Sequence, residues 1–210
     1  MVTVKDNYLS EEEHQTLYNI VSSEYFPWYF NWYTNFYVSK DLEFPYKKIV
    51  DPHSKEGIKQ DLLKKERINI KNKRAPHAGF SDSDINETDL ESFQFVHVFY
   101  NLSRVNSSEI KIVEPILTKL NYKALIRVKL NLNPYSQKLM VWPYHQDQAF
   151  KAKAAIYYLN TNNGYTLFKK GKKKINSVKN RIVFFDADDY HLGTNSTNCK
   201  NRLVLNINYF

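Results

Sequence analysis

Apolar and polar positions alternate along much of the second half of the chain, as they do in strands that have one polar face. In the stretch ALIRVKLNLN, apolar positions alternate with the polar residues Arg127, Lys129 and Asn131. Successive side chains of a strand point to opposite faces, so this alternation is typical of a half-buried strand. Residues 123–133 are therefore predicted to form a strand whose polar side chains share one face.

Short runs of this kind recur between turn signals. Turns are indicated by the segments TNNG and KKGKK, because Gly and Asn tolerate the backbone angles that tight turns need. Many short strands separated by turns favour a sandwich or barrel over a parallel sheet built from strand–helix–strand units. Further strands are predicted over residues 29–38, 93–100, 141–147, 153–160, 165–169, 174–178, 181–186 and 202–209.

Two helices are predicted beside these strands. Ser10 and Glu13 have the spacing of a capping box, and apolar residues follow at helical intervals, so residues 11–23 are predicted to form an amphipathic helix. The apolar spacing from Val113 to Leu120 indicates a second, shorter helix. The predicted fold class is mostly β with flanking helices.

The length of 210 residues favours a single domain. Residues 1–38 are predicted to contribute the first helix and strand, and residues 91–210 the β-rich core. Residues 40–90 are polar and weakly periodic, and they include the charged run KKERINIKNKR. We interpret them as a covering insertion or lid, since long segments of this kind often carry binding loops. The alternative is a solvated surface excursion.

The composition narrows the class of protein. A formal charge of +8 at pH 7 favours acidic partners, such as nucleic acid, anionic metabolites or acidic peptides, without selecting one of them. The single cysteine, Cys199, excludes an internal disulfide and a thiolate zinc cluster, and is interpreted as an incidental thiol. The sequence shows neither the apolar run of a signal peptide nor a membrane span, so a cytoplasmic location without membrane contact is expected.

The run VWPYHQDQAF places two good metal ligands, His145 and Asp147, two positions apart. In a strand both side chains lie on one face and can converge on one ion. His191, which follows the apolar strand RIVFF, is the candidate for a third ligand. Two imidazoles and one carboxylate form the facial triad of non-haem Fe(II) oxygenases, which leaves coordination positions open. The ligand types alone leave Mn and Zn as alternatives.

Arg202 opens the predicted final strand, RLVLNINYF, shortly after His191. A guanidinium binds a carboxylate through two parallel hydrogen bonds, so an arginine near an iron site matches the distal end of a dicarboxylate co-substrate. Asn206 shares the strand face of Arg202 and is therefore a further candidate for this binding group.

The order His145-x-Asp147, then His191, then Arg202 on the last strand resembles the signature of the Fe(II)/2-oxoglutarate-dependent oxygenases. Within that superfamily the chain is most similar to the prolyl-4-hydroxylase-like branch, through the segments YLNTNNGYTLF and DNYLSEEE. The similarity is good over residues 127–210.

The chain departs from the pattern of that branch in a few places. The Gly-Gly of the family is Asn163-Gly164 here, and Tyr165 replaces the Glu that precedes Thr166. Many prolyl hydroxylases have Lys at the position of Arg202. These departures bear on the substrate class more than on the chemistry.

The resemblance implies a double-stranded β-helix, a jelly-roll or cupin-like barrel, in which His145, Asp147 and His191 hold Fe(II). It implies that 2-oxoglutarate chelates the iron, that Arg202 grips its far carboxylate, and that O2 is consumed with release of succinate and CO2. The expected reaction is hydroxylation of an unactivated C–H bond of a protein side chain, such as proline, or of a small molecule. Ascorbate is a further cofactor that the resemblance allows.

Other residues are assigned to the site from position alone. Asn131 and Lys129 lie on a strand whose family counterpart often lines the co-substrate pocket, and the hydroxyl of Tyr135 is a candidate partner for a carboxylate. The candidates for the substrate pocket are Trp142, Tyr157 and Thr166.

Several other polar residues have simpler explanations. His97 lies in the apolar strand FQFVHVFY and is interpreted as a hydrogen-bonded core histidine. The lysine-rich run at 169–174 is interpreted as a solubilising hairpin edge, with contact to nucleic acid as the alternative. The acidic residues before His191 are interpreted as solvated turn residues; they are Asp186, Asp188 and Asp189.

Two other functions compete with the oxygenase hypothesis. A non-catalytic β-helix module could bind nucleic acid or a peptide, but such a module needs neither the triad nor the arginine. A zinc-dependent hydrolase could use the same ligands, but no candidate general base stands beside them, and Arg202 would have no role.

Overall fold

The computed structural model describes residues 1–31, 93–142 and 144–210. Of these, Met1–Asn31 and Gln94–Phe210 form one compact unit. The covering insertion expected over 40–90 lies outside the described residues, so the division of the chain into domains stays a prediction.

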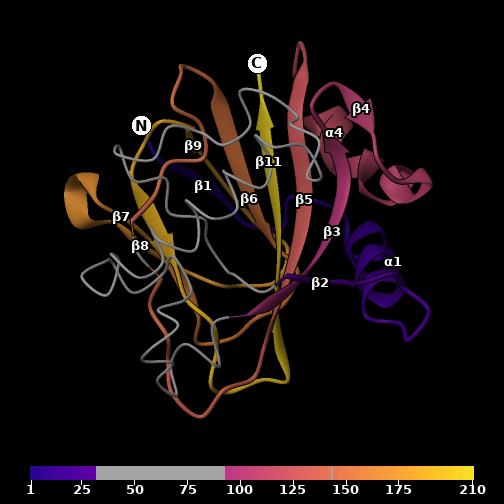
Figure 1. Cartoon of the computed structure of the whole chain (residues 1–210), viewed down its shortest axis with the longest axis vertical. Coiled ribbons are helices and arrows are strands. Elements are labelled where there is room, and N and C mark those ends of the chain that lie inside the picture. The colour runs from indigo at the N-terminus through magenta and orange to yellow at the C-terminus, as the bar shows by residue number, and fades with distance from the viewer. Residues whose placement is uncertain (32–92, 143) are drawn as a thin grey trace, which may run out of the picture. The chain divides into compact units, whose positions relative to one another are not determined.

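The described part of the chain consists mainly of antiparallel strands, with short helices beside them (Figure 1). The elements in chain order are β1 (Thr3–Lys5), α1 (Glu11–Val21), β2 (Tyr29–Asn31), β3 (Gln94–Asn101), β4 (Arg104–Val105), η1 (Ser108–Val113), α4 (Glu114–Lys119), β5 (Leu125–Pro134), β6 (Lys153–Tyr158), β7 (Tyr165–Phe168), η2 (Lys170–Lys172), β8 (Lys174–Asn176), β9 (Arg181–Asp186), β10 (His191–Gly193) and β11 (Asn201–Tyr209). Among these described elements, no helix is both long and apolar enough to cross a membrane.

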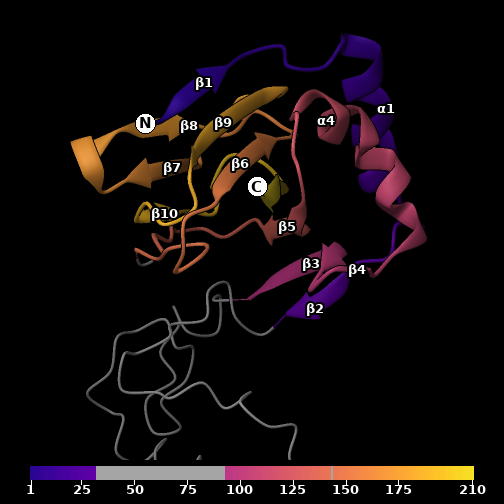
Figure 2. The ribbon, with the colours of Figure 1, turned by 90° about the horizontal axis from the view of Figure 1, so that it is seen from above.

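The strands form a large sheet and a small sheet. The large sheet has eight strands in the order β1-β9-β6-β11-β5-β3-β2, with β4 paired to β3, and the small sheet has the order β10-β7-β8. Figure 2 shows the small sheet lying against one face of the large sheet. From β6 onward the chain passes back and forth between the two sheets, because β6, β9 and β11 lie in the large sheet and β7, β8 and β10 lie in the small one. This is the jelly-roll arrangement, and the predicted fold class is confirmed.

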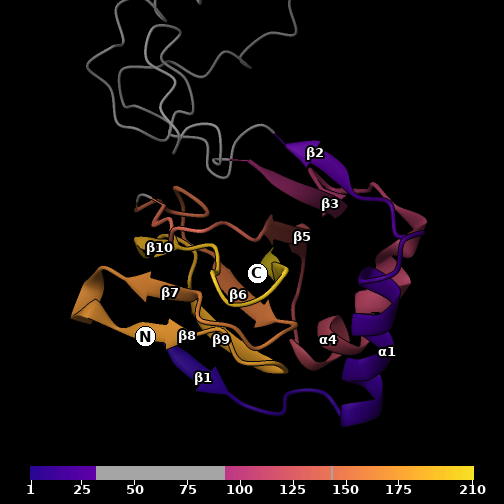
Figure 3. The same cartoon turned by 90° about the horizontal axis from the view of Figure 1, so that it is seen from below.

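The outer face of the large sheet is covered by the helices. Alternate residues of β11, such as Leu203 and Leu205, are fully buried in one apolar cluster with Leu17 of α1 and Ile116 of α4. Figure 3 shows α1 and α4 on the side of the large sheet that faces away from β7 and β8. Burial of each such side chain contributes about 1.5–3 kcal/mol, so this packing is what holds the large sheet in place.

The inner face is apolar on the side of β6 and β9, where a second cluster joins the two sheets. Ile156 and Val204 of the large sheet are buried in one cluster with Phe168 and Ile175 of the small sheet. Val204 belongs to the alternate set of β11 residues that begins with Arg202. Arg202 therefore shares the inner face with this cluster.

Along β5 and the rest of β11 the inner face is polar. Directly opposed residues of an antiparallel pair share a face, so the register of these two strands shows which polar side chains are neighbours. The opposed polar pairs on this face are Arg202 with Asn133, Asn206 with Lys129, and Asn208 with Arg127. The polar face predicted for residues 123–133 is therefore the inner face of the barrel.

Most of the predicted elements are present within the described residues. The helix predicted over 11–23 is α1, whose first turn carries the reciprocal Ser10–Glu13 capping box. The strand predicted over 141–147 is wrong, because the described residues of this segment make only isolated bridges, to Thr194 and to His191 of β10. β1 and β10 were not anticipated, since three residues are too few to show a periodicity.

Candidate metal centre

His145 and His191 face each other across two backbone hydrogen bonds. The N–H of each residue donates to the carbonyl of the other, both at 2.9 Å, which makes them a hydrogen-bonded antiparallel pair. Side chains of such a pair lie on the same side of the ladder, and the two ring centroids are 4.5 Å apart. This one bridge brings together imidazoles from segments that are far apart in the chain.

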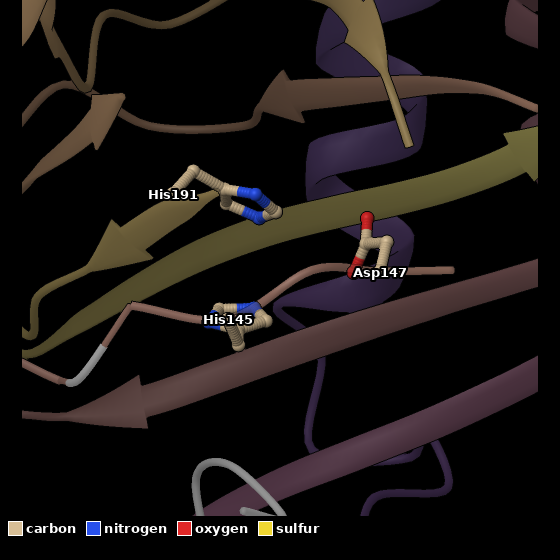
Figure 4. Close-up of side chains that lie close together, drawn as sticks. All are labelled: His145, Asp147 and His191. Atoms are coloured by element: carbon tan, nitrogen blue, oxygen red, sulfur yellow. The ribbon is translucent and has the colours of Figure 1, made fainter. Parts of the chain in front are cut away.

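Asp147 completes a cluster with the two histidines. One ligand atom from each of the three residues lies within 4.8 Å of the other two. Figure 4 shows the three side chains pointing toward one another, with His191 on β10 and the other two on the segment before β6. The N–H of Asp147 donates to the carbonyl of Ala187 at 3.0 Å, which anchors this bend beside β9. The structure therefore brings together the three residues that the sequence analysis selected.

Both carboxylate oxygens of Asp147 are oriented by side chains of the large sheet. Nη2 of Arg127 donates to Oδ1 and Nδ2 of Asn208 donates to Oδ2, each at 2.9 Å. Burial by itself would raise the pKa of Asp147, but the Arg127 charge, the two histidines and the Asn208 hydrogen bond outweigh it and hold the pKa well below its usual range. Asp147 is therefore an anion of fixed orientation.

The ring of His191 is oriented by a backbone carbonyl. Its Nδ1 lies 3.1 Å from the carbonyl oxygen of Asp189, which can only accept, so Nδ1 donates. This assigns the remaining lone pair of the neutral ring to Nε2, the state in which imidazole binds a metal. Phe168 and Phe185 contact the ring, with centroids at 5.8 and 4.8 Å.

Arg202 is buried on the same inner face, and its guanidinium is only partly satisfied. It is 4% exposed; Nε donates to the hydroxyl of Ser177 at 2.9 Å, and the guanidinium carbon lies 5.5 Å from the centroid of the Tyr158 ring. Nη2 is buried without a hydrogen-bond partner among the described residues. Burial lowers the pKa of Arg202. A buried cation with an unused donor is the group that an anionic ligand would complete.

Two glycines leave room for this guanidinium. A Cβ on Gly164 would lie 2.6 Å from Cδ of Arg202 and 2.5 Å from the carbonyl oxygen of Asn195, closer than real Cβ atoms approach. A Cβ on Gly193 would lie 4.0 Å from Nη1 of Arg202, which places that nitrogen beside β10. Because Gly193 follows His191 by two residues, the guanidinium and the metal cluster lie along the same short strand.

Replacing Gly164 with alanine is expected to displace the Arg202 side chain. Overpacking at such a site costs about 1–3 kcal/mol, and we expect a loss of that size in the free energy of unfolding, measured with urea. Gly171→Asn is the matched control, because that turn glycine (φ +72°) has open space around it and Asn tolerates positive φ. Equal stability of Gly164→Ala and wild type would contradict the close contact.

Some of the other predicted site residues lie near the metal cluster and Arg202, and others do not. Trp142 is buried beside Gly193, and buried Thr166 is paired with Gly193 and accepts a hydrogen bond from Tyr158 at 2.7 Å. Asn131 and Asn206 lie on the inner face. Tyr135 follows the end of β5 and is 53% exposed, and no hydrogen bond of its hydroxyl occurs within the described part of the chain.

The prediction that Tyr157 lines the cavity is wrong. Tyr157 is buried in the outer apolar cluster, and its hydroxyl contacts Nδ1 of His14 in α1 at 2.6 Å and donates to Asn180 at 3.0 Å. Neighbouring residues of a strand face opposite ways, so it is Tyr158 that points inward and lies under Arg202. The strand was predicted correctly, but the wrong one of its two adjacent tyrosines was predicted to point inward.

Arg127 and Asn208 are residues of the candidate site that the sequence analysis did not assign to it. The alternation of β5 and β11 placed them on polar faces, but only the register of the two strands shows that they are opposed and reach Asp147. Ser177 was missed as well, because it follows β8 and is joined to Arg202 only through the fold.

Asp188 lies in the turn before His191, as predicted, whereas Asp186 is the last residue of strand β9 rather than a turn residue. Asp186 and Asp188 are paired with Lys153 and Lys151, each at 2.7 Å, and are not part of the metal cluster. His97 lies in the outer core, where its Nδ1 contacts the carbonyl of Pro27 at 2.8 Å; its buried Nε2 has no partner within the described residues.

No family model and no curated protein sequence matches the chain. Among solved structures, a prolyl hydroxylase from Trichoplax adhaerens, determined with a peptide fragment of hypoxia inducible factor, is 10% identical; the match covers 100% of this chain and 83% of that one, with a TM-score of 0.52. A Pseudomonas putida prolyl-4-hydroxylase is 10% identical, with coverage of 99% and 91% and a TM-score of 0.45. A viral collagen prolyl hydroxylase from Paramecium Bursaria Chlorella virus-1 is 15% identical, with coverage of 55% and 78% and a TM-score of 0.40.

The match to the Trichoplax protein extends over the whole chain, and at this identity it establishes the fold. The two-sheet topology described above agrees with it independently. The chain therefore has the same jelly-roll fold as this prolyl hydroxylase.

Proposed function

We propose that the chain is an Fe(II)- and 2-oxoglutarate-dependent dioxygenase that hydroxylates an unactivated C–H bond. The observation that carries this proposal is the presence, on one inner face, of a His–Asp–His cluster and a buried arginine with an unused donor. The donor set fits a ferrous ion, since two imidazoles and one carboxylate on one side of a metal leave its other positions open. The unused Nη2 of Arg202 fits a carboxylate.

In this proposal each residue has a defined task. His145, His191 and Asp147 hold the ion, with Asp147 kept in place by Arg127 and Asn208. A ferrous ion together with 2-oxoglutarate supplies the activation of dioxygen, with succinate and carbon dioxide as products.

At the other end of the site, Arg202 binds the distal carboxylate of 2-oxoglutarate, and Ser177 orients its guanidinium through Nε. Tyr158 and Thr166 form a buried hydrogen-bonded pair beside it. Together with Trp142 they exclude water from this end of the site, which strengthens the ion pair between the guanidinium and the co-substrate.

Two rival functions account for less of this arrangement. A binding module has no need of a carboxylate held by two side chains beside two histidines. A metal-dependent hydrolase would leave the guanidinium of Arg202 buried without a partner, which is costly for a cation. For the substrate we propose a protein side chain or a small molecule, and the peptide held by the Trichoplax protein supports the first of these by analogy.

Anaerobic addition of Fe(II) and 2-oxoglutarate tests the proposal directly. We expect a weak visible absorption band that needs both additions, because the keto acid must chelate the bound ion. Admission of air should then release succinate. A folded protein that shows neither the band nor succinate release would refute the oxygenase proposal in favour of a binding module.

A further inference from the structure

The inner face carries one cation for which the proposed chemistry has no use. Arg127, Lys129 and Arg202 all lie on this face of β5 and β11. Arg127 is paired with Asp147, and Arg202 is assigned to the co-substrate. Within the described part of the chain, the Lys129 ammonium forms no hydrogen bond and no ion pair.

Lys129 lies in the middle of the polar face, beside the metal cluster. Its cross-strand neighbours are Asn206 of β11 and Val98 of β3, and the next residue of β5 on the same face is Arg127. The side chain is half-buried. Burial and the nearby charge of Arg127 both lower the pKa of Lys129, and the charge of Asp147 raises it. The net effect lowers the pKa to about 8. The ammonium group is thus held inside the barrel yet remains accessible to a ligand.

The charges around the proposed centre leave Lys129 uncompensated. Asp147 is paired with Arg127, and in the proposed complex Arg202 is paired with the distal carboxylate of 2-oxoglutarate. Among the described residues of this face of β5 and β11, Lys129 is then the cation that has no anionic partner. A substrate without an anionic group would leave this ammonium unpaired and partly desolvated, which costs free energy. A substrate that carries a carboxylate removes that cost, even when its net charge is zero.

Two unused acceptors adjoin Lys129 on the same face. Oδ1 of Asn131 and Oδ1 of Asn208 are buried without hydrogen-bond partners among the described residues. The Nδ2 of Asn208 donates to Asp147, so its Oδ1 is the atom left over. Asn131 lies two positions along β5 from Lys129, and Asn208 lies diagonally across on β11. A ligand that satisfies all three residues needs a negative group and N–H donors.

We propose that Lys129 binds the carboxylate of the substrate, and that the substrate is an amino-carboxylate, a small zwitterion such as a free amino acid, whose ammonium donates to the asparagine oxygens. This inference rests on the proposed oxygenase function and narrows its substrate class. In this proposal Lys129 binds the carboxylate of the substrate and not the carboxylate of 2-oxoglutarate that lies next to the metal. The experiment below distinguishes these two carboxylates.

The experiment measures succinate release by the Fe(II)- and 2-oxoglutarate-loaded protein with a panel of free amino acids and their carboxamides. We expect at least one acid to stimulate release and its carboxamide to fail. In Lys129→Gln the half-saturating concentration of that acid should rise about 30-fold or more, because one partner of a desolvated charge pair is lost. Lys129→Arg should restore much of the loss.

The controls separate this inference from the oxygenase proposal. Lys129→Gln should keep the visible band and the wild-type dissociation constant for 2-oxoglutarate, which also shows that it is folded. Lys123→Gln, which removes an exposed lysine just before β5, should match wild type. Weakened 2-oxoglutarate binding by Lys129→Gln, equal stimulation by carboxamides, or no stimulation by any amino acid when the band is present would each overturn the proposal. Absence of the band in wild type would instead overturn the oxygenase function itself.

Discussion

Asp147→Asn is expected to weaken ferrous binding strongly and to abolish succinate release. The change keeps the size of the side chain and an acceptor for Arg127, but it removes the anionic ligand from the cluster. The pKa of Asp147 is held well below its usual range, so wild type presents a carboxylate throughout the working pH range. Loss of a direct ligand should exceed the effect of losing an outer partner, so we expect metal affinity to fall by about 100-fold or more. Anaerobic metal titration and succinate assays measure the two effects.

The matched control for this variant is Asp188→Asn. Asp188 lies three residues before His191, but its carboxylate is paired with exposed Lys151 outside the cluster. It should retain metal binding and succinate release. If Asp147→Asn bound Fe(II) as well as wild type while Asp188→Asn did not, the turn aspartates would have to replace Asp147 in the assignment.

Arg202→Met is expected to weaken 2-oxoglutarate binding and to leave Fe(II) binding intact. The guanidinium is separated from the cluster along β10 and contacts none of the three ligands, so only the co-substrate should lose a partner. Losing one member of a buried charge pair raises the dissociation constant by roughly 100-fold. Titration of the visible band with 2-oxoglutarate at saturating metal measures this change.

Thermal unfolding gives an independent reading of the same site. In wild type, 2-oxoglutarate should raise the melting temperature when metal is present, because a ligand that binds only the folded state stabilises it. In Arg202→Met this increase should disappear. Without ligand the variant should be no less stable than wild type, since it removes a buried and partly unsatisfied charge.

The control arginine is Arg181, which forms a bidentate pair with Asp6 rather than lying in the site. Arg181→Met should lower stability slightly and leave the 2-oxoglutarate dissociation constant unchanged. An Arg202→Met variant that bound 2-oxoglutarate like wild type would remove this residue from the co-substrate site, whatever its effect on stability.

The local pattern of the chain was enough to predict most strands, the first helix and the residues of the metal cluster. These inferences needed only short-range information: the period of two along β5 and β11, the capping box of α1, and the His145-x-Asp147 spacing followed by a histidine after an apolar strand. The order of the three cluster residues and Arg202 along the chain was likewise enough to indicate the family resemblance before any contact was known.

The partners of these residues depended on contacts between distant parts of the chain. Asp147 is oriented by residues 20 and 61 positions away, and Arg202 by a serine 25 positions away. A period of two says that Tyr157 and Tyr158 face opposite ways, but only packing against α1 shows that Tyr157 is the outer one. Register and the choice of inner face arise from which surfaces bury each other, and no short window of sequence contains that information.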